Sequence, residues 1–457
     1  MHPIFARAGE PSVPILFVTA ANFDKATEII DDRERTFLRA AGYEPKPGRH
    51  LLVPAVDGKL AGVLFGLENA DEPLKDLFQP GALASLLPPG TYRFANAPHD
   101  ARLAVLAFAL GAYQFTRYRK ADERKVRLVL PDGVNGDDLT RIVEGAALAR
   151  DLINTPSNDM GPAELEEAAR ALAKRHGASV SATSGDALEK NFPLVAAVGA
   201  GSPRAPRLID MTWGSVTDPK ITLVGKGVCF DTGGLDIKND TGMLNMKKDM
   251  AGGATALGLA HMIMARKLKV RLRVIIPAVE NSISGTSFRP RDIYTSRKGI
   301  SVEIGNTDAE GRLILADALA LADEDKPALI ADFATLTGAA RVALGPELPP
   351  FFTDDDALAG ELAGYAAAEN DPLWRMPLWR PYEAMLDSKV ADTNNVSTGG
   401  HGGAITAALF LRKFVAAKSW LHFDIFAWTP AARPGRPEGA ELQSARALYA
   451  LLCARYS

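Results

Sequence analysis

Cysteine is scarce in this sequence, and both an excess of positive charge and long hydrophobic runs are absent from it. Its 457 residues include only two cysteines, Cys229 and Cys453, which are too few for a disulfide framework and are typical of a reducing compartment. No apolar run reaches the roughly 18 residues that a membrane helix needs, and the short apolar segment Val13–Ala21 is interpreted as a buried strand, not a signal peptide. We therefore expect a cytoplasmic protein without membrane association.

The charge balance and several missing motifs exclude other classes of function. Lys and Arg number 52 and Asp and Glu number 55, so a formal net charge of −3 gives no positive field that would attract nucleic acid. The motifs HExxH, GxSxG, the Walker A loop and the GxGxxG fingerprint are all absent. Their absence counts against a histidine-rich mononuclear zinc site, a serine nucleophile and a nucleotide-binding loop.

The remaining composition is that of an ordinary globular protein. Hydrophobic residues make up 47% and charged residues 23%, and the 40 Gly and 30 Pro are unremarkable at this length. The length indicates two to four domains. We predict a smaller N-terminal α/β domain over residues 1–135, a linking helix over residues 136–158 and a larger C-terminal α/β domain over residues 159–457.

Hydrophobic periodicity predicts alternating strands and helices in both domains. The first should contain strands at Val13–Thr19, His50–Val53 and Val126–Leu130, and helices at Ala101–Tyr118 and at Asp137–Asn154, the latter opened by an Asp cap. The regular alternation in the second favours a mixed, largely parallel sheet covered by helices. The strands expected there are Ile221–Val224, Val270–Val279, Ile300–Gly305, Ala328–Phe333 and Trp420–Ile425, and the helices are Pro162–His176, Met250–Lys267, Leu313–Ala322 and Ala404–Ala416.

Charged side chains gather after three of the expected strands. In open α/β sheets, functional residues collect beyond the carboxyl ends of the strands. The glycine-rich segments that follow Ile221–Val224, Ile300–Gly305 and Ala328–Phe333 supply carboxylates, lysines and an arginine. These candidate site residues are Lys226, Asp231, Lys238, Asp249, Asp308, Glu310 and Arg312.

The four carboxylates favour a metal site. Brought together without cations they would repel one another, and oxygen-rich sites suit Mg²⁺, Mn²⁺ and Zn²⁺. Asp308 and Glu310 are two residues apart, so in an extended segment both side chains would face one way. Singly, Asp231 has a plainer interpretation as a turn residue, Asp249 as a helix cap and Asp317 as a structural carboxylate. Their occurrence together at matching strand ends favours two metal ions.

An eight-residue segment carries a resemblance to a known family. Asn306–Leu313, with the sequence NTDAEGRL, resembles the signature of the leucyl aminopeptidase family, the cytosolic di-metal, M17-type aminopeptidases. Five companion segments occur in the right order, and the resemblance covers about residues 100–430. The companions are VGKG at 224–227, FDTGG at 230–234, the pair Ile237-Lys238, MKKDM at 246–250 and TLTGA at 335–339, and GGAITAA at 402–408 also fits.

The resemblance implies two divalent metal ions per subunit. The ions would be Mn²⁺ or Zn²⁺, with Mg²⁺ or Co²⁺ as alternatives in a more exchangeable site, and a water bridging them would attack the peptide carbonyl. Lys238 would polarise this carbonyl, and Arg312 would hold a bicarbonate that acts as the general base. The tight site would be Lys226, Asp231, Asp249 and Glu310, and the exchangeable site Asp231, Asp308 and Glu310.

The resemblance also implies an architecture and a substrate. Members of the family have a macro-like N-terminal domain and a C-terminal catalytic domain, and they usually form hexamers. The substrate would be a peptide with a free α-amine, and its first residue would be neutral and apolar, such as Leu or Met, since no Lys or Arg is placed to pair with an acidic side chain. The substrate-binding residues would be Met246, Asn306, Thr335, Leu336, Gly338 and Ala339.

Two other functions stay open at this point. Carboxylate-bridged metal ions also serve phosphoryl transfer, so a two-metal phosphoesterase is one alternative, although the implied lysine ligand and the TLTGA segment count against it. A non-catalytic scaffold or nucleic-acid-binding homologue is the other. Loss of a metal ligand would mark such a homologue, and none of the implied ligands is missing.

Overall fold

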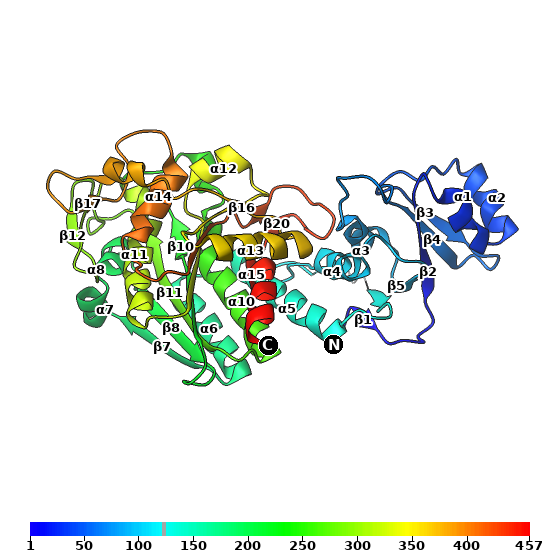
Figure 1. Ribbon diagram of the computed structural model, residues 1–457, viewed down its shortest axis with the longest axis horizontal. Helices are drawn as coiled ribbons and strands as arrows, with labels where there is room; N and C mark the ends of the chain where they lie inside the picture. The colour runs from blue at the N-terminus through cyan, green and yellow to red at the C-terminus, as the bar shows by residue number, and fades with distance from the viewer. Residues whose placement is uncertain (121–124) are drawn as a thin grey trace. The chain divides into compact units, whose positions relative to one another are not determined.

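A computed structural model describes residues 1–120 and 125–457, and the chain forms two compact units (Figure 1). The first comprises residues 1–144 and 430–439, and the second comprises residues 145–429 and 440–457. Helix α5 (Gly136–Asn154) runs through the division between them. The segment 430–439, which the sequence placed in the C-terminal domain, thus belongs to the first unit, where Gly81 allows the backbone of Gly435 to approach closely.

The first unit is built on a six-stranded mixed sheet in the order β1-β6-β5-β2-β4-β3. All neighbours are parallel except β3 and β4, which are antiparallel. On one face of the sheet, Leu16, Val18 and Leu64 form a core with Leu38 of the overlying helix α2. The strands are β1 (Phe5–Ala6), β2 (Val13–Val18), β3 (His50–Pro54), β4 (Leu60–Gly66), β5 (Gly90–Phe94) and β6 (Val126–Val129), and the helices are α1 (Phe23–Ala26), α2 (Asp32–Ala40), α3 (Leu83–Leu86) and α4 (Ala101–Gly111).

The second unit contains a nine-stranded sheet whose centre is parallel. Its order is β16-β15-β18-β14-β9-β11-β8-β7, with β10 also paired to β11. Strands β18, β14, β9 and β11 run parallel, whereas β8 and β7 continue the edge antiparallel. These strands are β7 (Ser179–Ser184), β8 (Arg207–Trp213), β9 (Lys220–Gly225), β10 (Gly227–Asp231), β11 (Arg271–Asn281), β14 (Leu329–Ala334), β15 (Pro350–Phe352), β16 (Trp374–Arg375) and β18 (Trp420–Asp424).

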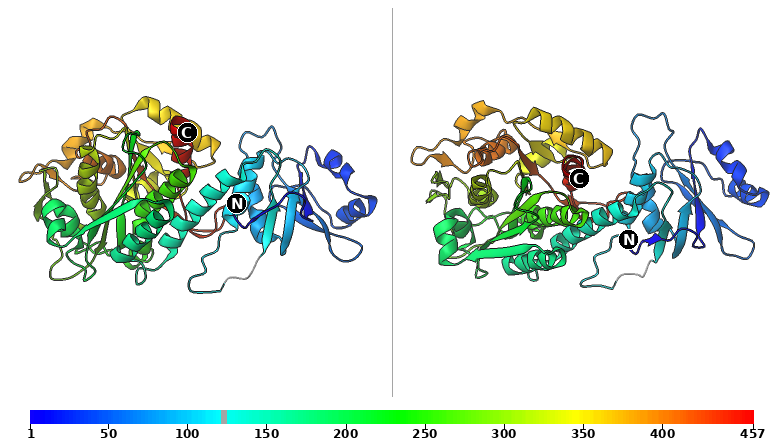
Figure 2. Two further views of the ribbon diagram at one scale, coloured as in Figure 1. Left: turned by 90° about the horizontal axis from the view of Figure 1, so that it is seen from below. Right: turned by 60° about the horizontal axis from the view of Figure 1, so that its bottom comes forward.

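Helices cover both faces of this sheet, as the views in Figures 1 and 2 show. Helices α6, α10, α13 and α15 form one layer, and α7, α8, α11 and α14 pack on the other face around a core that includes Val224, Ile275 and Leu315. Among the described residues, no helix is long and apolar enough to span a membrane. The longer helices are α6 (Pro162–His176), α10 (Ala251–Arg266), α11 (Glu310–Glu324), α13 (Asp356–Ala368), α14 (Gly403–Arg412) and α15 (Ala445–Tyr456), and the shorter ones are α7 (Asp186–Asn191), α8 (Pro193–Gly199), α9 (Asp240–Met243) and α12 (Gly338–Leu344).

The first domain departs from its prediction at two helix ends. Helix α4 stops at Gly111 and does not reach Tyr118, because most residues from Gln114 onwards are exposed and offer no buried face to stabilise further turns. Helix α5 is capped by Asn135 and not by Asp137, since Oδ1 of Asn135 accepts hydrogen bonds from the backbone N–H groups of Asp137 and Asp138 at 3.1 and 3.0 Å.

Two local predictions near the site are also wrong. The strand expected at Ile300–Gly305 is only Ser301–Glu303 (β13), and it lies in a separate small sheet with β12 (Ile293–Thr295) and β17 (Thr393–Asn394). The segment with Asp308 and Glu310 is not extended: Asp308 lies in a 3₁₀ turn and Glu310 is the first residue of α11. Both carboxylates reach the site from the start of a helix.

Candidate active site

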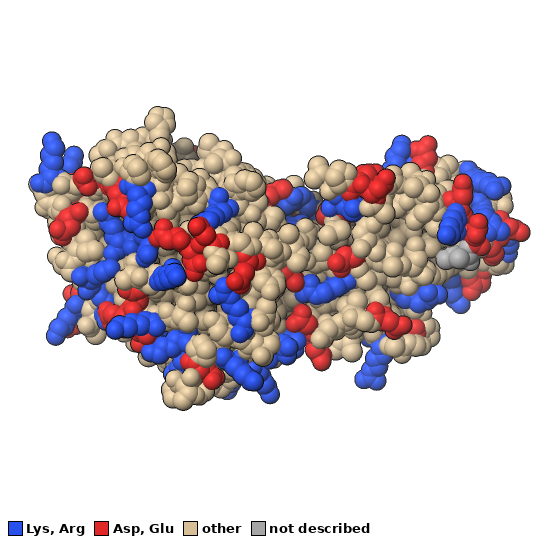
Figure 3. Space-filling view, viewed as in Figure 1, with Lys and Arg blue, Asp and Glu red and all other residues tan. Residues whose placement is uncertain are grey.

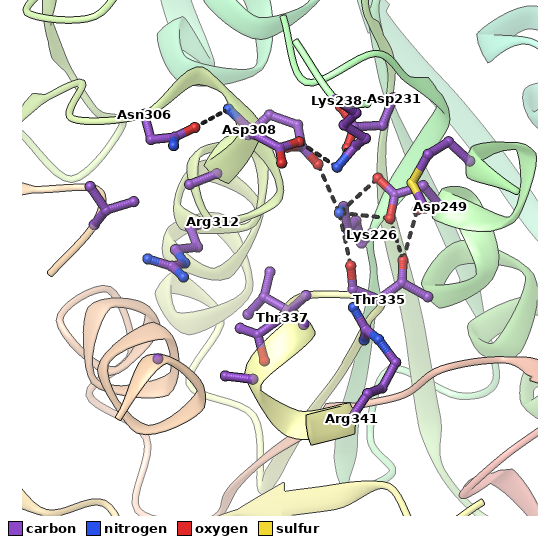
Figure 4. A pocket seen from close by; sticks show the side chains of 18 of the residues that line it. Lys226, Asp231, Lys238, Asp249, Asn306, Asp308, Arg312, Thr335, Thr337 and Arg341 are labelled. Atoms are coloured by element: carbon purple, nitrogen blue, oxygen red, sulfur yellow. Dashed lines mark hydrogen bonds and ion pairs between the residues drawn. The ribbon is translucent and has the colours of Figure 1, made fainter. Parts of the chain in front are cut away.

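A cavity of about 300 Å³ lies beyond the carboxyl ends of β9, β10 and β14. It receives side chains from β10, from the 3₁₀ helix η3 (Met246–Met250), from the start of α11 and from the segment that leads into α12 (Figure 4). Every site residue expected from the sequence lines this one cavity. They are Lys226, Asp231, Lys238, Met246, Asp249, Asn306, Asp308, Glu310, Arg312, Thr335, Leu336, Gly338 and Ala339.

Three carboxylates meet with the geometry of a metal site. Asp231, Asp308 and Glu310 each offer an oxygen, and these oxygens lie within 4.8 Å of one another. Asp231 and Glu310 are buried, and Oε2 of Glu310 accepts no hydrogen bond from any described residue. Burial, and after it the charge of Asp231, raises the pKa of Glu310 well above its ordinary value. Buried oxygens that lack donors suit hard or borderline divalent cations, so these residues fit a metal ion.

Lys226 and Asp249 complete the buried end of the cluster. Nζ of Lys226 lies 2.8 Å from Oδ2 of Asp249 and 2.8 Å from Oε1 of Glu310, and it donates to the carbonyl oxygen of Thr335 at 3.0 Å. Burial lowers the pKa of Lys226, but the charges of Asp249, Glu310 and Asp231 outweigh burial and raise it above its ordinary value. To ligate a metal the amine must be neutral, so binding an ion would displace this proton.

Glycines let the backbone come close enough to place Lys226. A Cβ on Gly311, the glycine of NTDAEGRL, would lie 2.6 Å from Cε of Lys226. A Cβ on Gly252, in the first turn of α10, would lie 2.0 Å from the carbonyl oxygen of Phe333. Both contacts are far shorter than real side chains permit. Glycine is therefore required for steric reasons at Gly311, in NTDAEGRL, and at Gly252, two residues after MKKDM, where α11 and α10 approach Lys226.

Asp231 is held by neighbours that include Asn281, a residue that no motif revealed. Its Oδ1 accepts hydrogen bonds from Nδ2 of Asn281, at the end of β11, and from the backbone N–H of Gly233, at 2.9 and 2.8 Å. Its Oδ2 is 2.8 Å from Nζ of Lys238, which also pairs with Asp308. Burial, with the charge of Asp249 next, raises the pKa of Asp231 to about 6. Lys238 is thus part of the carboxylate cluster.

Arg312 lies on the side of the cavity opposite Asp249 (Figure 4). It is the third residue of α11 and is largely buried, and its Nη1 donates to the carbonyl oxygen of Asn395 at 2.6 Å. Burial lowers the pKa of its guanidinium to about 10. Its Nε has no acceptor among the described residues. The side chain thus keeps donors for an anion.

The TLTGA segment is fixed by a buried carboxylate from the next strand. Oδ1 of Asp424, at the end of β18, accepts hydrogen bonds from the backbone N–H groups of Leu336 and Thr337 at 3.0 and 3.2 Å. Thr337 in turn caps α12 by accepting a hydrogen bond from the backbone N–H of Ala340 at 3.1 Å. Asp424 lies outside every motif in the sequence, and only the parallel pairing of β14 with β18 brings it here.

Two basic residues that the sequence did not single out also line the cavity. They are Lys248, in η3, and Arg341, in α12. The prediction that no Lys or Arg is placed to pair with an acidic first side chain did not take these two residues into account. Burial, and after it the charge of Arg341, lowers the pKa of Lys248 to about 7. Further lining residues are Thr337, Ala309 and Gly403, which lie within the quoted motifs but were not among the predicted site residues, and Val396, which lies outside them.

Two family models together match most of the chain. The catalytic domain of the cytosol aminopeptidase family matches residues 147–449, and the N-terminal domain of M17 aminopeptidases matches residues 13–131. The chain belongs to the cytosol aminopeptidase family. Among curated relatives, a probable cytosol aminopeptidase of Sinorhizobium medicae is 43% identical over 345 residues, 70% of this chain and 69% of the relative. One from Roseiflexus castenholzii is 41% identical over 352 residues, 72% of each chain.

Solved structures of the family share the whole architecture. The crystal structure of a cytosol aminopeptidase from Coxiella burnetii is 44% identical, covers 100% of both chains and superposes with a TM-score of 0.95. The bottromycin maturation enzyme BotP in complex with Mn is 30% identical, with 97% of this chain and 99% of that chain covered and a TM-score of 0.88. The predicted α/β fold and family are therefore confirmed, and the activity class is that of a metal-dependent aminopeptidase, a hydrolase.

Proposed function

We propose that this cytosol aminopeptidase removes one residue at a time from peptides with a free α-amine, using two divalent ions. The observation that carries the proposal is the convergence of four carboxylates, Lys238 and Arg312 on one cavity beyond the ends of the parallel strands. A phosphoesterase or a non-catalytic scaffold has no comparable support, because every residue that the family resemblance implied is present and close to its partners.

The metal-binding residues divide into two overlapping sets. Lys226, Asp231, Asp249 and Glu310 would hold the tight ion, and Asp231, Asp308 and Glu310 would hold the exchangeable one. When bound, the two ions would supply Lewis-acid activation of water and of the peptide carbonyl. We propose Mn²⁺ or Zn²⁺ for these sites, with Mg²⁺ or Co²⁺ in the exchangeable site, and the manganese complex of BotP supports the first choice.

Lys238 and Arg312 act on the reacting atoms. The Lys238 ammonium, next to Asp231 and Asp308, is placed to polarise the scissile carbonyl and to stabilise negative charge that develops on its oxygen. Arg312 has free donors for a bicarbonate, whose chemistry is that of a general base. This assignment leaves the carboxylates to the metal ions and explains how a site without a histidine can move a proton.

The substrate would lie with its amine toward Asp249 and its first side chain toward η3 and α12. Met246, Leu336 and Ala339 give that region apolar surface, which supports neutral side chains such as Leu and Met. Thr335, Gly338 and Asn306 would contribute polar or backbone contacts. The amine contact fixes the carbonyl over the reacting centre, so its loss should reduce the rate strongly.

A panel of aminoacyl anilides tests this function. Leu-anilide should be cleaved in the presence of Mn²⁺, and acetyl-Leu-anilide should be cleaved very poorly, because acetylation removes the basic amine. A phosphate-ester substrate, with and without Mn²⁺, provides the comparison with phosphoesterases. Equal rates for the free and acetylated anilides, or hydrolysis of the phosphate ester alone, would refute the proposal.

The oligomeric state and the cellular compartment of the protein are also proposals. We propose a homohexamer on the resemblance alone, and sedimentation that shows only monomer at micromolar concentration would contradict it. We propose the cytoplasm because a chain with only two cysteines, too few for a disulfide framework, is typical of a reducing compartment. We propose no nucleic-acid partner, since acidic and basic side chains are interspersed on the face shown in Figure 3.

A further inference from the structure

We propose that Lys248 and Arg341 form a carboxylate-binding subsite for the side chain of an N-terminal Glu or Asp. The inference rests on the aminopeptidase function proposed above and extends its substrate range to acidic first residues. It reverses the expectation drawn from the sequence that acidic residues are poor substrates.

The two cations belong to the same elements as the pocket for the first side chain. Lys248 lies two residues after Met246 in η3, and Arg341 lies two residues after Ala339 in α12. Figure 4 shows Arg341 beside Thr335, on the side of the cavity away from Arg312. Met246, Ala339, Lys248 and Arg341 all line the same cavity, so a first side chain held against Met246 and Ala339 lies in the cavity that both basic residues face.

Neither cation has an anionic partner. Lys226 and Lys238 each pair with two carboxylates, whereas the side chains of Lys248 and Arg341 form no ion pair or hydrogen bond with any described residue. Nη1 of Arg341 is buried without an acceptor. Their shared contact is the ring of Phe426, whose centroid lies 4.4 Å from Nζ of Lys248 and 5.2 Å from Cζ of Arg341.

The Phe426 ring holds the two basic side chains in place but supplies no negative charge to pair with them. A cation–π contact contributes less than the cost of burying a charge without a partner. Five basic and four acidic residues line the cavity within the described chain. Two bound divalent ions would neutralise the carboxylates and leave the cavity more positive still. A carboxylate that enters between Lys248 and Arg341 would supply the missing anion, and Arg341 could bind it in a bidentate manner.

Two groups of a peptide could deliver that carboxylate: the side chain of an acidic first residue or the free C-terminus of a dipeptide. The position favours the first. Arg341 lies beside Thr335, in the segment assigned to the first side chain, while Arg312 and Asn306 lie on the opposite side, toward which the remainder of the peptide would extend.

The test compares isosteric substrates in the full-length, metal-loaded protein. Glu- and Gln-anilide differ in charge and hardly in shape, so the ratio of their kcat/KM values measures recognition of the charge. We expect a ratio of about ten or more in the wild type, and of about one in Arg341→Gln and Lys248→Met. Arg341→Lys should keep most of the preference, because it retains the charge.

Lys247→Met is the matched control. Lys247 is in the same turn, but its Nζ donates to the carbonyl oxygen of Asn154 at 2.7 Å and does not line the cavity, so the variant should keep the wild-type ratio. Calorimetric binding of L-glutamate against L-glutamine gives a second readout that does not require turnover. Here too, the preference for glutamate should disappear in Arg341→Gln.

The outcomes separate the two proposals. If no anilide is cleaved, the aminopeptidase function fails, and the binding preference alone decides the subsite. If Leu-anilide is cleaved but Glu-anilide is no better than Gln-anilide, the subsite is refuted and the function stands. If the variants change the preference for Leu-Leu over Leu-Leu-amide instead, the cations bind the peptide C-terminus and the proposal is wrong.

Discussion

The hydroxyl of Thr337 donates a hydrogen bond to Oδ2 of Asp424 at 2.5 Å. The same carboxylate accepts the backbone N–H groups of Leu336 and Thr337 through Oδ1, so one buried side chain fixes the start of the substrate-binding segment. Asp424 does not line the cavity and acts on substrate only through that segment. It is a positioning residue for the pocket of the first side chain.

We expect Asp424→Asn to raise KM for Leu-anilide about tenfold or more, with a smaller effect on kcat. An amide can accept through one oxygen only, and a lost hydrogen bond to a charged group costs about 1.5–3 kcal/mol. Thr337→Val removes only the hydroxyl contact and should have a smaller effect. Metal content should stay at the wild-type value in both variants. A fall in kcat with unchanged KM would show that Asp424 acts on the metal site instead.

Removal of metal should abolish hydrolysis. Four carboxylates and Lys226 surround sites that we assign to two ions, so strong chelation should eliminate activity and Mn²⁺, Zn²⁺ or Co²⁺ should restore it. Elemental analysis should give about two ions per chain in the wild type, and fewer in Asp308→Ala and Glu310→Ala. Full activity in protein verified to be free of metal would contradict the assignment.

Substitution of Lys238 or Arg312 should have a different effect from substitution of a metal ligand. Lys238→Ala and Arg312→Ala should retain metal but turn over slowly, because they remove groups that act in the transition state. Loss of one preorganised electrostatic donor costs roughly 10²–10³ in kcat. Bicarbonate should stimulate the wild type but not Arg312→Ala. Wild-type kcat in Lys238→Ala would refute its role in polarising the carbonyl.

The central strands and the motif residues were predictable because both depend on local sequence. The apolar runs at Ile221–Val224 and Ala328–Phe333 became β9 and β14, and the residues after them line one cavity. By contrast, β7 (Ser179–Ser184) was missed because its sequence, SVSATS, offers little hydrophobic alternation. The three-residue strand β13 was placed in the wrong sheet, since periodicity cannot specify a partner for so short a segment.

The supporting residues could not be predicted because they are defined by tertiary contacts. Asn281 and Asp424 lie outside the motifs and reach Asp231 and Thr337 only through strand pairing. Lys247 and Lys248 are adjacent and chemically identical in the sequence. Only the fold shows that one donates to the backbone of Asn154 and the other lines the cavity.

The interpretation of Asp317 as a structural carboxylate agrees with its position in α11. It is fully buried, and it accepts backbone hydrogen bonds from Leu194 and Arg297, each at 2.8 Å, and from Val195 at 3.4 Å. Burial raises the pKa of its carboxyl group to about 6, against the lowering effect of these hydrogen bonds. It is also remote from the metal ligands, so its titration can be followed separately.

The raised pKa of Asp317 predicts a specific dependence of stability on pH. Because the folded state binds this proton more tightly than the unfolded state, the contribution of Asp317 to stability is fully present below about pH 4 and is lost as the pH rises through about 6. The loss in the free energy of unfolding should amount to roughly 3 kcal/mol, because the pKa rises from 3.8 to about 6 and each tenfold difference in proton affinity corresponds to about 1.36 kcal/mol.

The variants Asp317→Asn and Asp317→Ala test this prediction, because neither has a group that titrates at this position. Both variants should be less stable than the wild type, because they lose buried hydrogen bonds. The difference in the free energy of unfolding between the wild type and each variant should nevertheless become smaller by roughly 3 kcal/mol between pH 4 and pH 7, because only the wild type loses the contribution of Asp317. Urea unfolding of the three proteins across this pH range measures this difference, and a difference that stays constant or grows as the pH rises would show that the pKa of Asp317 is not raised in the folded protein.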